Sequence, residues 1–146
     1  MRKSYRLNEA DISLPDYWKD TTINAFILPS SKKAGEAEAT FVITRDGDAK
    51  SDSVEHYADT QLVEASKKLN RYKFIERQAA RISDQPTIQV DYTWVTPDRI
   101  EIRQRQVYVR YQTSFLIFTL TARANEFETY ETAWENAIAS VKLRDV

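Results

Sequence analysis

The chain has 146 residues, of which 42% are hydrophobic and 29% are charged, and its formal net charge is −1. This length predicts one folded domain, residues 1–146, with a sizeable core. The near-neutral charge argues against a nucleic acid or an acidic membrane as partner, because both attract strongly basic proteins. The absence of cysteine excludes disulfides, thiolate chemistry and cysteine-based zinc sites.

Residues needed for common catalytic and cofactor sites are scarce. The chain has one histidine, His56, and two glycines, Gly35 and Gly47, whereas phosphate-binding loops need several glycines close together. The basic N-terminal start is not followed by an apolar region of signal-peptide type, and no window approaches the about 18 apolar residues of a membrane span. We therefore expect a cytoplasmic protein that needs no cofactor and does not insert into a membrane.

The first third of the chain predicts extended structure. Residues 5–14 read as one extended segment that ends at the turn pair Pro15-Asp16. Residues 22–28 are apolar on both faces, which predicts a strand covered on both sides. The polar residues 30–38 predict a mobile loop, and residues 40–45 predict another strand.

Residues 53–69 predict an amphipathic helix that begins at Ser53, a good N-cap, and ends near Asn70, which tolerates a left-handed conformation. At about 100° per residue one apolar arc contains Val54, Tyr57, Ala58, Leu62, Ala65 and Leu69. Gln61 falls inside this arc. A buried amide without partners costs about 1–3 kcal/mol, so Gln61 either bonds within the fold or faces a molecule outside the chain.

The second half predicts four more strands. Residues 72–82 are extended, and the turn at 96–99 folds residues 100–109 back on residues 87–96 as a hairpin. The run at 114–122 is apolar on both faces, which is typical of a central strand. Alternation in 87–96 places on one face Ile88, Val90, Tyr92 and Trp94.

The strand at 100–109 repeats the anomaly of the helix. One face carries Ile102, Gln104, Gln106 and Tyr108. The apolar side changes midway along this strand, which predicts a bulge. If the face continues, two glutamines lie between apolar neighbours, as Gln61 does.

The last element predicts a second helix that begins at Asn125, with a capping box completed by Glu128. Apolar residues then recur at helical spacing, namely Phe127, Tyr130, Trp134, Ala137, Ile138 and Val141. The order of three strands, a helix, four strands and a helix predicts an α+β fold with a largely antiparallel sheet.

Three conventional sites are disfavoured. His56 in the first helical turn is more typical of a solvated surface residue than of a hydrolase base, since no nucleophile motif accompanies it. The loop DGDAKSD at 46–52 has Lys50 at the third position of a calcium loop. A basic strip could be formed by Arg99, Arg103, Arg105 and Arg110. Arg103 and Arg105 share a strand face with Glu101, however, and no aromatic side chains are interleaved for stacking, so a solvated face is favoured over a nucleic-acid site. We expect no enzyme, no metal site and no nucleic-acid site.

The remaining candidate is a groove lined by Ile23, Ala25, Val42, Gln61, Ala65 and Gln106. Small and aliphatic side chains give it an apolar floor, and the amides offer donors and acceptors. This chemistry suits an apolar guest helix, such as a transmembrane helix held outside lipid. The alternative, in which both glutamines bond inside the fold, stays open at this point.

An ordered set of segments resembles a known family. The segments are YRLNEADISLPDYWKDTTINAFILP, ATFVITRD, YADTQLVEASKKL, VDYTW, RQVYV and TLTA. In this order and spacing, over residues 5–141, they resemble the DcrB-like family and, within it, the Eag-type chaperones of bacterial type VI secretion systems.

The resemblance implies a Mog1/PsbP-like α+β fold with a curved sheet and two main helices. It also implies a homodimer that shields the N-terminal transmembrane helices of a PAAR-containing or Rhs-type effector in the cytoplasm and helps to load it onto the VgrG spike. The same six groove positions would bind the client, with Gln61 and Gln106 bonding the guest helices. Ala25 is smaller than the branched aliphatic residue expected there. A DcrB-like scaffold domain for a soluble partner is the alternative.

Overall fold

The computed structural model describes residues 2–28 and 39–144. The strands are β1 (Arg2–Arg6), β2 (Asp11–Pro15), β3 (Asn24–Ile27), β4 (Thr40–Asp46), β5 (Lys73–Ile82), β6 (Gln85–Val95), β7 (Glu101–Tyr111) and β8 (Ser114–Arg123). The helices are α1 (Val54–Lys68), the 3-10 helix η1 (Ala124–Tyr130) and α2 (Glu131–Ala139). The loop expected at 30–38 lies outside the described residues.

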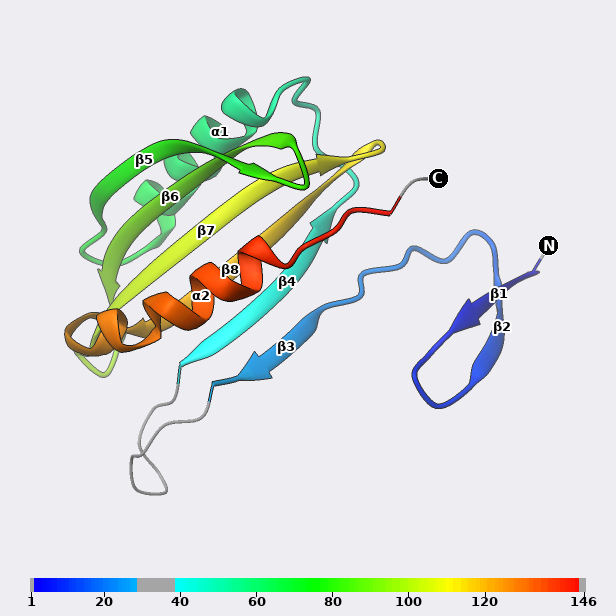
Figure 1. The fold of residues 1–146 in the computed structure, drawn as a ribbon, viewed down its shortest axis with the longest axis horizontal. Helices are drawn as coiled ribbons and strands as arrows, with labels where there is room; N and C mark the ends of the chain where they lie inside the picture. The colour runs from blue at the N-terminus through cyan, green and yellow to red at the C-terminus, as the bar shows by residue number, and fades with distance from the viewer. Residues whose placement is uncertain (1, 29–38, 145–146) are drawn as a thin grey trace.

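Six strands form one curved antiparallel sheet in the order β3-β4-β8-β7-β6-β5, and β1 and β2 form a separate hairpin. Helix α1 lies on one face of the sheet, and η1 and α2 lie on the other (Figure 1). The predicted α+β class with a largely antiparallel sheet and two main helices is therefore confirmed. Strand β8 is central, as its apolar character on both faces predicted.

The N-terminal segment differs from the expectation of a single extended stretch. The backbone N–H of Leu7 donates to the carbonyl of Ala10 at 2.8 Å, and this turn folds β2 back on β1. Four strands rather than three therefore precede α1 among the described residues. The turn contains neither glycine nor proline, so the usual sequence signal of a hairpin is missing.

The prediction that β3 is covered on both sides is wrong. Strand β3 lies at the edge of the sheet and pairs with β4. Its large apolar side chains are largely bare, with Phe26 54% and Ile27 66% exposed, and Ile23 just before the strand is 63% exposed. Apolar residues on both faces of a strand predict that other elements pack on both faces, but the described part of the chain places no such element over β3.

Helix α1 begins as predicted. The Ser53 hydroxyl accepts a hydrogen bond from the backbone N–H of His56 at 3.1 Å, which satisfies one orphan amide of the first turn. The helix ends at Leu69 in an extended conformation, and the left-handed residue is Arg71 (φ 54°), not Asn70. The predicted arc is confirmed, since Val54, Tyr57 and Ala58 are buried, and Leu62, Ala65 and Leu69 pack on the same core.

The core beneath α1 is rich in tyrosine. The Tyr57 ring stacks on Phe115 of β8 with centroids 4.2 Å apart, and its hydroxyl donates to Asp46 at 2.8 Å. Burial raises the pKa of Tyr57 and of Tyr108, and it raises the pKa of Tyr92 to about 12. These hydroxyls therefore keep their protons in the folded state at a pH where an exposed tyrosine, with a pKa of about 10, loses its proton.

This shift makes stability depend on alkaline pH. Above about pH 10 the unfolded chain binds fewer protons than the folded chain, so the free energy of unfolding falls as pH rises from about 10 towards 12. We expect urea unfolding to show this fall, and Tyr108→Phe to make it shallower. Tyr17→Phe is the control, because Tyr17 is 81% exposed. An unchanged slope in Tyr108→Phe contradicts the prediction.

No bulge lies where the sequence predicted it. The register of β7 with β6 is continuous from Tyr108 to Glu101, and the irregularity lies in β5 between Phe74 and Glu76. The apolar side of β7 changes because the cover of the sheet changes along the strand. The pair Val107 and Val109 belongs to the core on the α2 side, whereas Tyr108 belongs to the core beneath α1.

The predicted capping box at Asn125 is also wrong. Asn125 lies within η1, whose N-cap is Arg123 without a side-chain cap bond. The apolar spacing nevertheless places Phe127, Tyr130 and Trp134 in the core on the α2 side, as expected.

A buried ionic cluster holds η1 and the start of α2 on the sheet. The carboxylate of Asp91 is fully buried and accepts hydrogen bonds from Arg103 at 2.7 Å and Arg105 at 3.0 Å. Arg105 also donates to Glu131 of α2 at 3.2 Å. Both guanidinium groups lie over the Phe127 ring, at 4.5 and 5.0 Å. Burial alone lowers the pKa of Arg105, but its bonds to the two carboxylates outweigh this effect and raise it.

Candidate binding site

One row of residues crosses the sheet from its edge to the space beneath α1. The register pairs Ala25 with Val42, Val42 with Thr119, Thr119 with Gln106, and Gln106 with Val90. Directly paired residues of antiparallel strands project on the same face. Val90 is buried in the core beneath α1, so the whole row lies on the α1 face.

Helix α1 covers only part of this face. It packs on β6 and β7, whereas β4 and β3 extend beyond it (Figure 1). We call the uncovered part the open α1 face. It carries Ile23 just before β3, Ala25 and Ile27 of β3, and Val42 of β4. Ile23 and Ile27 are among the most exposed large apolar side chains of the described residues, so this face is apolar and bare.

Gln61 lies on the side of α1 that borders the open α1 face. Tyr57 and Ala65 flank it one turn before and one turn after, and Tyr57 stacks on Phe115 of β8. Four helical residues advance about 6 Å, nearly the advance of two strand residues. Tyr57 also contacts Tyr108 of β7. Gln61 follows Tyr57 by four helical residues and Gln106 precedes Tyr108 by two strand residues, so Gln61 and Gln106 lie at the same level.

The side chain of Gln61 is half-buried, and its amide makes no hydrogen bond to another described residue. It is neither sealed in the core nor bonded across the sheet. The amide therefore keeps its donors and its acceptor for a molecule outside the chain.

Gln106 is different, because its own strands supply most of its partners. Its Nε2 donates to the Thr119 hydroxyl at 3.1 Å, and its Oε1 accepts from the Tyr108 hydroxyl. One N–H of the amide remains. Gln104 repeats the arrangement, because its Oε1 accepts from Trp94 at 3.0 Å and its Nε2 donates to Thr121 at 3.0 Å.

Sequence reasoning missed Thr119 and Thr121, although a signal was present. Both interrupt the apolar run of β8 at alternate positions. Two hydroxyls with the spacing of one strand face predict polar neighbours on the adjacent strand. The structure thus brings Ala25, Val42 and Gln106 onto one row, with Ile23 beside it and with Gln61 and Ala65 on the bordering helix.

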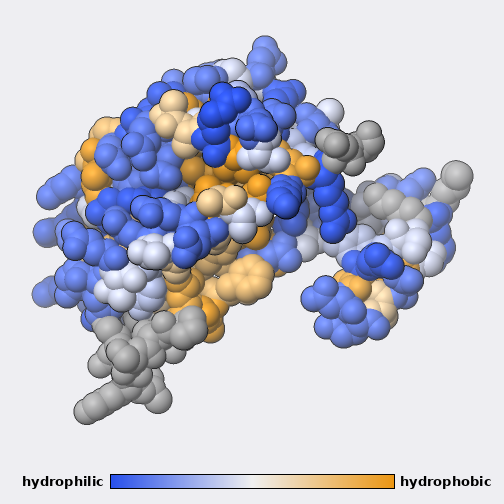
Figure 2. Space-filling model, viewed as in Figure 1, coloured by the Kyte–Doolittle hydropathy of each residue, from blue (hydrophilic) through white to orange (hydrophobic). Residues whose placement is uncertain are grey.

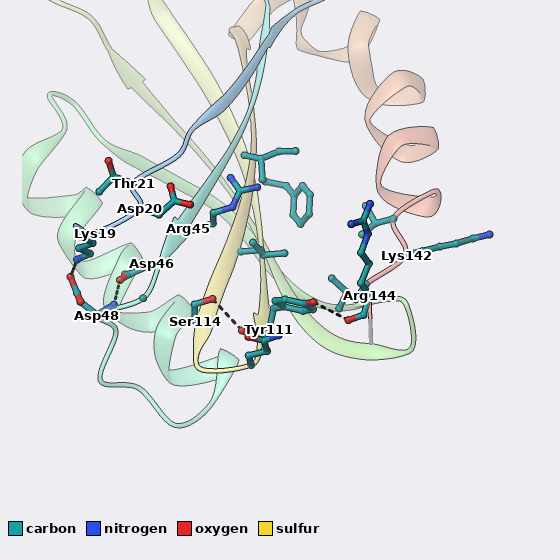
Figure 3. A pocket seen from close by; sticks show the side chains of 17 residues that line it. Lys19, Asp20, Thr21, Arg45, Asp46, Asp48, Tyr111, Ser114, Lys142 and Arg144 are labelled. Carbon is teal, nitrogen blue, oxygen red and sulfur yellow. Dashed lines mark hydrogen bonds and ion pairs between the residues drawn. The ribbon is translucent and has the colours of Figure 1, made fainter. Parts of the chain in front are cut away.

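A second concavity lies on the opposite, α2 side and was not predicted. It is a cleft of about 980 Å³ between residues 19–21, the end of β4, the β7–β8 turn and residues 141–144. Figure 3 shows Lys19, Asp20 and Thr21 on one side and Lys142 and Arg144 on the other. Its apolar lining consists of Ile43, Leu116, Phe118, Val141 and Leu143.

The conventional sites find no support in the geometry. His56 does not line this cleft. The predicted solvated face is wrong for Arg105, which is buried and, like Arg103, is bonded to Asp91. Arg110 donates to the carbonyls of Ser51 and Asp52. Within the described ranges, no three potential ligand side chains come together to hold a metal ion, and no helix is long and apolar enough to cross a membrane.

The fold and the sequence together define a family. The sequence profile of the DcrB family matches residues 9–140. The chain therefore belongs to the DcrB family.

Two comparisons place it more closely within that family. Effector EagT6 of Pseudomonas aeruginosa is 36% identical over 140 residues, which are 96% of this chain and 95% of EagT6. A crystal structure of the P. aeruginosa protein PA94, described as a putative regulator of unknown function, is 33% identical, covers 99% of each chain and has a TM-score of 0.85.

A more distant structure shows the fold alone. LpqN of Mycobacterium tuberculosis is 16% identical over 86% of this chain and 85% of its own, with a TM-score of 0.51. This similarity agrees with the Mog1/PsbP-like fold that the family resemblance implied.

Proposed function

We propose that this protein is a type VI secretion chaperone that binds the N-terminal transmembrane helices of an effector on the open α1 face. The kinship with EagT6 supports a chaperone role associated with such an effector. The observation that carries the proposal is the half-buried, unbonded amide of Gln61 at the border of a bare apolar surface.

The chemistry of this surface fits an apolar helix that has left, or not yet entered, a membrane. Burying apolar surface stabilises such a complex by about 25 cal/mol per Å² before the costs of association. A transmembrane helix also carries small polar groups that bond to neighbouring helices. Gln61 can donate to and accept from such groups, and Gln106 can donate one N–H.

The finer features of the proposal follow the family resemblance. Residues 1–146 act as one chaperone domain, in the bacterial cytoplasm and as a homodimer. The client is a PAAR-containing or Rhs-type effector, and the chaperone helps to load it onto the VgrG spike. The protein is not an enzyme and uses no nucleotide, so capture of the client proceeds without ATP.

The double variant Gln61→Ala plus Gln106→Ala tests the site. Each lost hydrogen bond costs about 1 kcal/mol, so we expect the affinity for the effector's N-terminal segment to fall about 10- to 30-fold. The Gln61 change carries the larger share, because the oxygen of Gln106 is already bonded to Tyr108. Co-purification from co-expressing cells and accumulation of the effector measure the effect.

Gln89→Ala is the matched control. Gln89 is half-buried like Gln61 but alternates with Val90 and so lies on the opposite face of β6. Unchanged capture by the double variant contradicts the proposed site. Capture of the effector's soluble part without its hydrophobic N-terminus supports the scaffold alternative instead.

A further inference from the structure

The hairpin β1–β2 has one apolar and one polar face. The register pairs Tyr5 with Ile12, and Leu14 lies on the same face as Ile12, two residues further on. The opposite face carries the pairs Ser4–Ser13 and Arg6–Asp11. An isolated two-stranded hairpin is at best marginally stable in water. This hairpin therefore needs a surface that covers its apolar face.

The described part of its own chain does not supply that surface. Ile12 is 46% exposed and Leu7 48%, and Trp18 just beyond the hairpin is 55% exposed. The hairpin stands apart from the sheet and its helices (Figure 1). The Tyr5 hydroxyl is hydrogen-bonded to the Thr22 hydroxyl of the following segment, so among the described residues the hairpin packs on its own tether rather than on the core.

The tether, residues 19–22, is fixed to the end of β4. Lys19 forms an ion pair with Asp48, and Arg45 donates to the Thr22 carbonyl at 3.2 Å and to Asn24 at 2.7 Å. These contacts determine the direction in which the hairpin leaves the body. They hold it outside the cleft that residues 19–21 themselves line.

The body carries a bare apolar surface of the matching kind. Figure 2 shows apolar side chains beside α2 that continue towards the cleft, and a smaller apolar patch on the hairpin. Phe26 is 54% exposed on this side, and Ile43 and Leu116 in the cleft are half-buried. Within residues 2–28 and 39–144, the bare surface and the apolar face of the hairpin thus lie in the same chain but do not contact each other.

The charges at the two surfaces are complementary. Lys142 and Arg144 at the cleft rim form no ion pair with a described acidic residue, and Glu9 in the hairpin turn forms none with a described basic residue. A hairpin seated in the cleft with its turn towards residues 142–144 brings these opposite charges together.

We propose that two copies exchange hairpins, so that the β1–β2 hairpin of each copy docks with its apolar face in the α2-side cleft of the other. Such an exchange is isologous and closes with two-fold symmetry. The inference takes the pairing of copies from the proposed function and adds the exchanged element and the cleft that receives it. Each cleft is incomplete without the hairpin of the second copy.

Charge on the apolar face tests the exchange. The wild-type chain of 17.0 kDa is expected to have twice that mass by light scattering. We expect Leu7→Asp plus Ile12→Asp to halve the mass to that of one chain, and Ser4→Asp plus Ser13→Asp, on the polar side, to leave it unchanged. A monomeric wild type, or a dimeric apolar-face variant, overturns the inference.

Disulfide trapping decides which surface receives the hairpin, since the chain has no cysteine of its own. One tagged copy carries Ile12→Cys, and the co-expressed second copy carries Leu116→Cys or Ile43→Cys. We expect mild oxidation to join the two copies for at least one cleft position, and Ser13→Cys to give far less product. A dimer that is never trapped at either position overturns the inference. A disulfide that forms within one chain carrying both Ile12→Cys and a cleft cysteine also overturns the inference.

The two proposals fail separately. Gln61→Ala should weaken capture of the effector segment without changing the dimer mass. A chain that exchanges hairpins but captures no hydrophobic segment keeps this inference and contradicts the proposed function. A monomeric chain that captures the segment on the open α1 face keeps the proposed client site and contradicts the hairpin exchange.

Discussion

Asp91→Ala is expected to destabilise the fold by about 3–5 kcal/mol, the usual cost of removing one partner of a buried ion pair. The Asp91 carboxylate is fully buried and accepts from both Arg103 and Arg105, and Arg105 is only 8% exposed. Without the carboxylate, the positive charge of Arg105 stays in the core with Glu131 as its remaining acidic partner. Urea unfolding monitored by circular dichroism measures the loss.

Glu131→Ala is the control for this prediction. Glu131 contacts the same arginine at 3.2 Å, but its side chain is 36% exposed. Water can replace an exposed carboxylate at little cost, so we expect a loss below about 1 kcal/mol. If Asp91→Ala costs no more than Glu131→Ala, the buried cluster does not hold η1 and α2 on the sheet as described.

Val42→Asp is expected to abolish capture of the effector segment while leaving the protein folded. Val42 lies at the centre of the row between Ala25 and Thr119, on the face that α1 leaves open. In the free protein a half-buried carboxylate there stays in contact with water. A docked apolar helix would remove that water and leave the charge unpaired, at a cost of several kcal/mol. A cost of about 3 kcal/mol is a loss of more than 100-fold in affinity.

Val63→Asp is the matched control, because Val63 is also aliphatic and is 50% exposed, but lies on the outward side of α1. Pull-down of a co-expressed effector N-terminus compares the two variants, and thermal unfolding confirms that both are folded. Equal capture by Val42→Asp and wild type places the client elsewhere. Equal loss in both variants points to a general effect of added charge.

Local patterns predicted most of the elements. The period of two in β6 and the period of 3.6 in α1 were confirmed, as was the N-cap at Ser53, because these features depend on neighbours in sequence. The errors have both long-range and local causes. The exposure of β3 depends on the strand order, and the turn at residues 7–10 lacks the glycine or proline that marks most hairpins.

The sequence by itself determined that glutamines interrupt two apolar faces, because the helical and strand periods alone show a polar amide at an apolar position. Only the tertiary structure decided which glutamine is available. Gln106 bonds to Thr119 because the register of β7 with β8 places them opposite each other. Gln61 borders the part of the sheet that α1 does not cover, and no described strand residue bonds to its amide. Hydrogen-bond partners across a sheet depend on register and cover, and both arise from contacts between residues far apart in the chain.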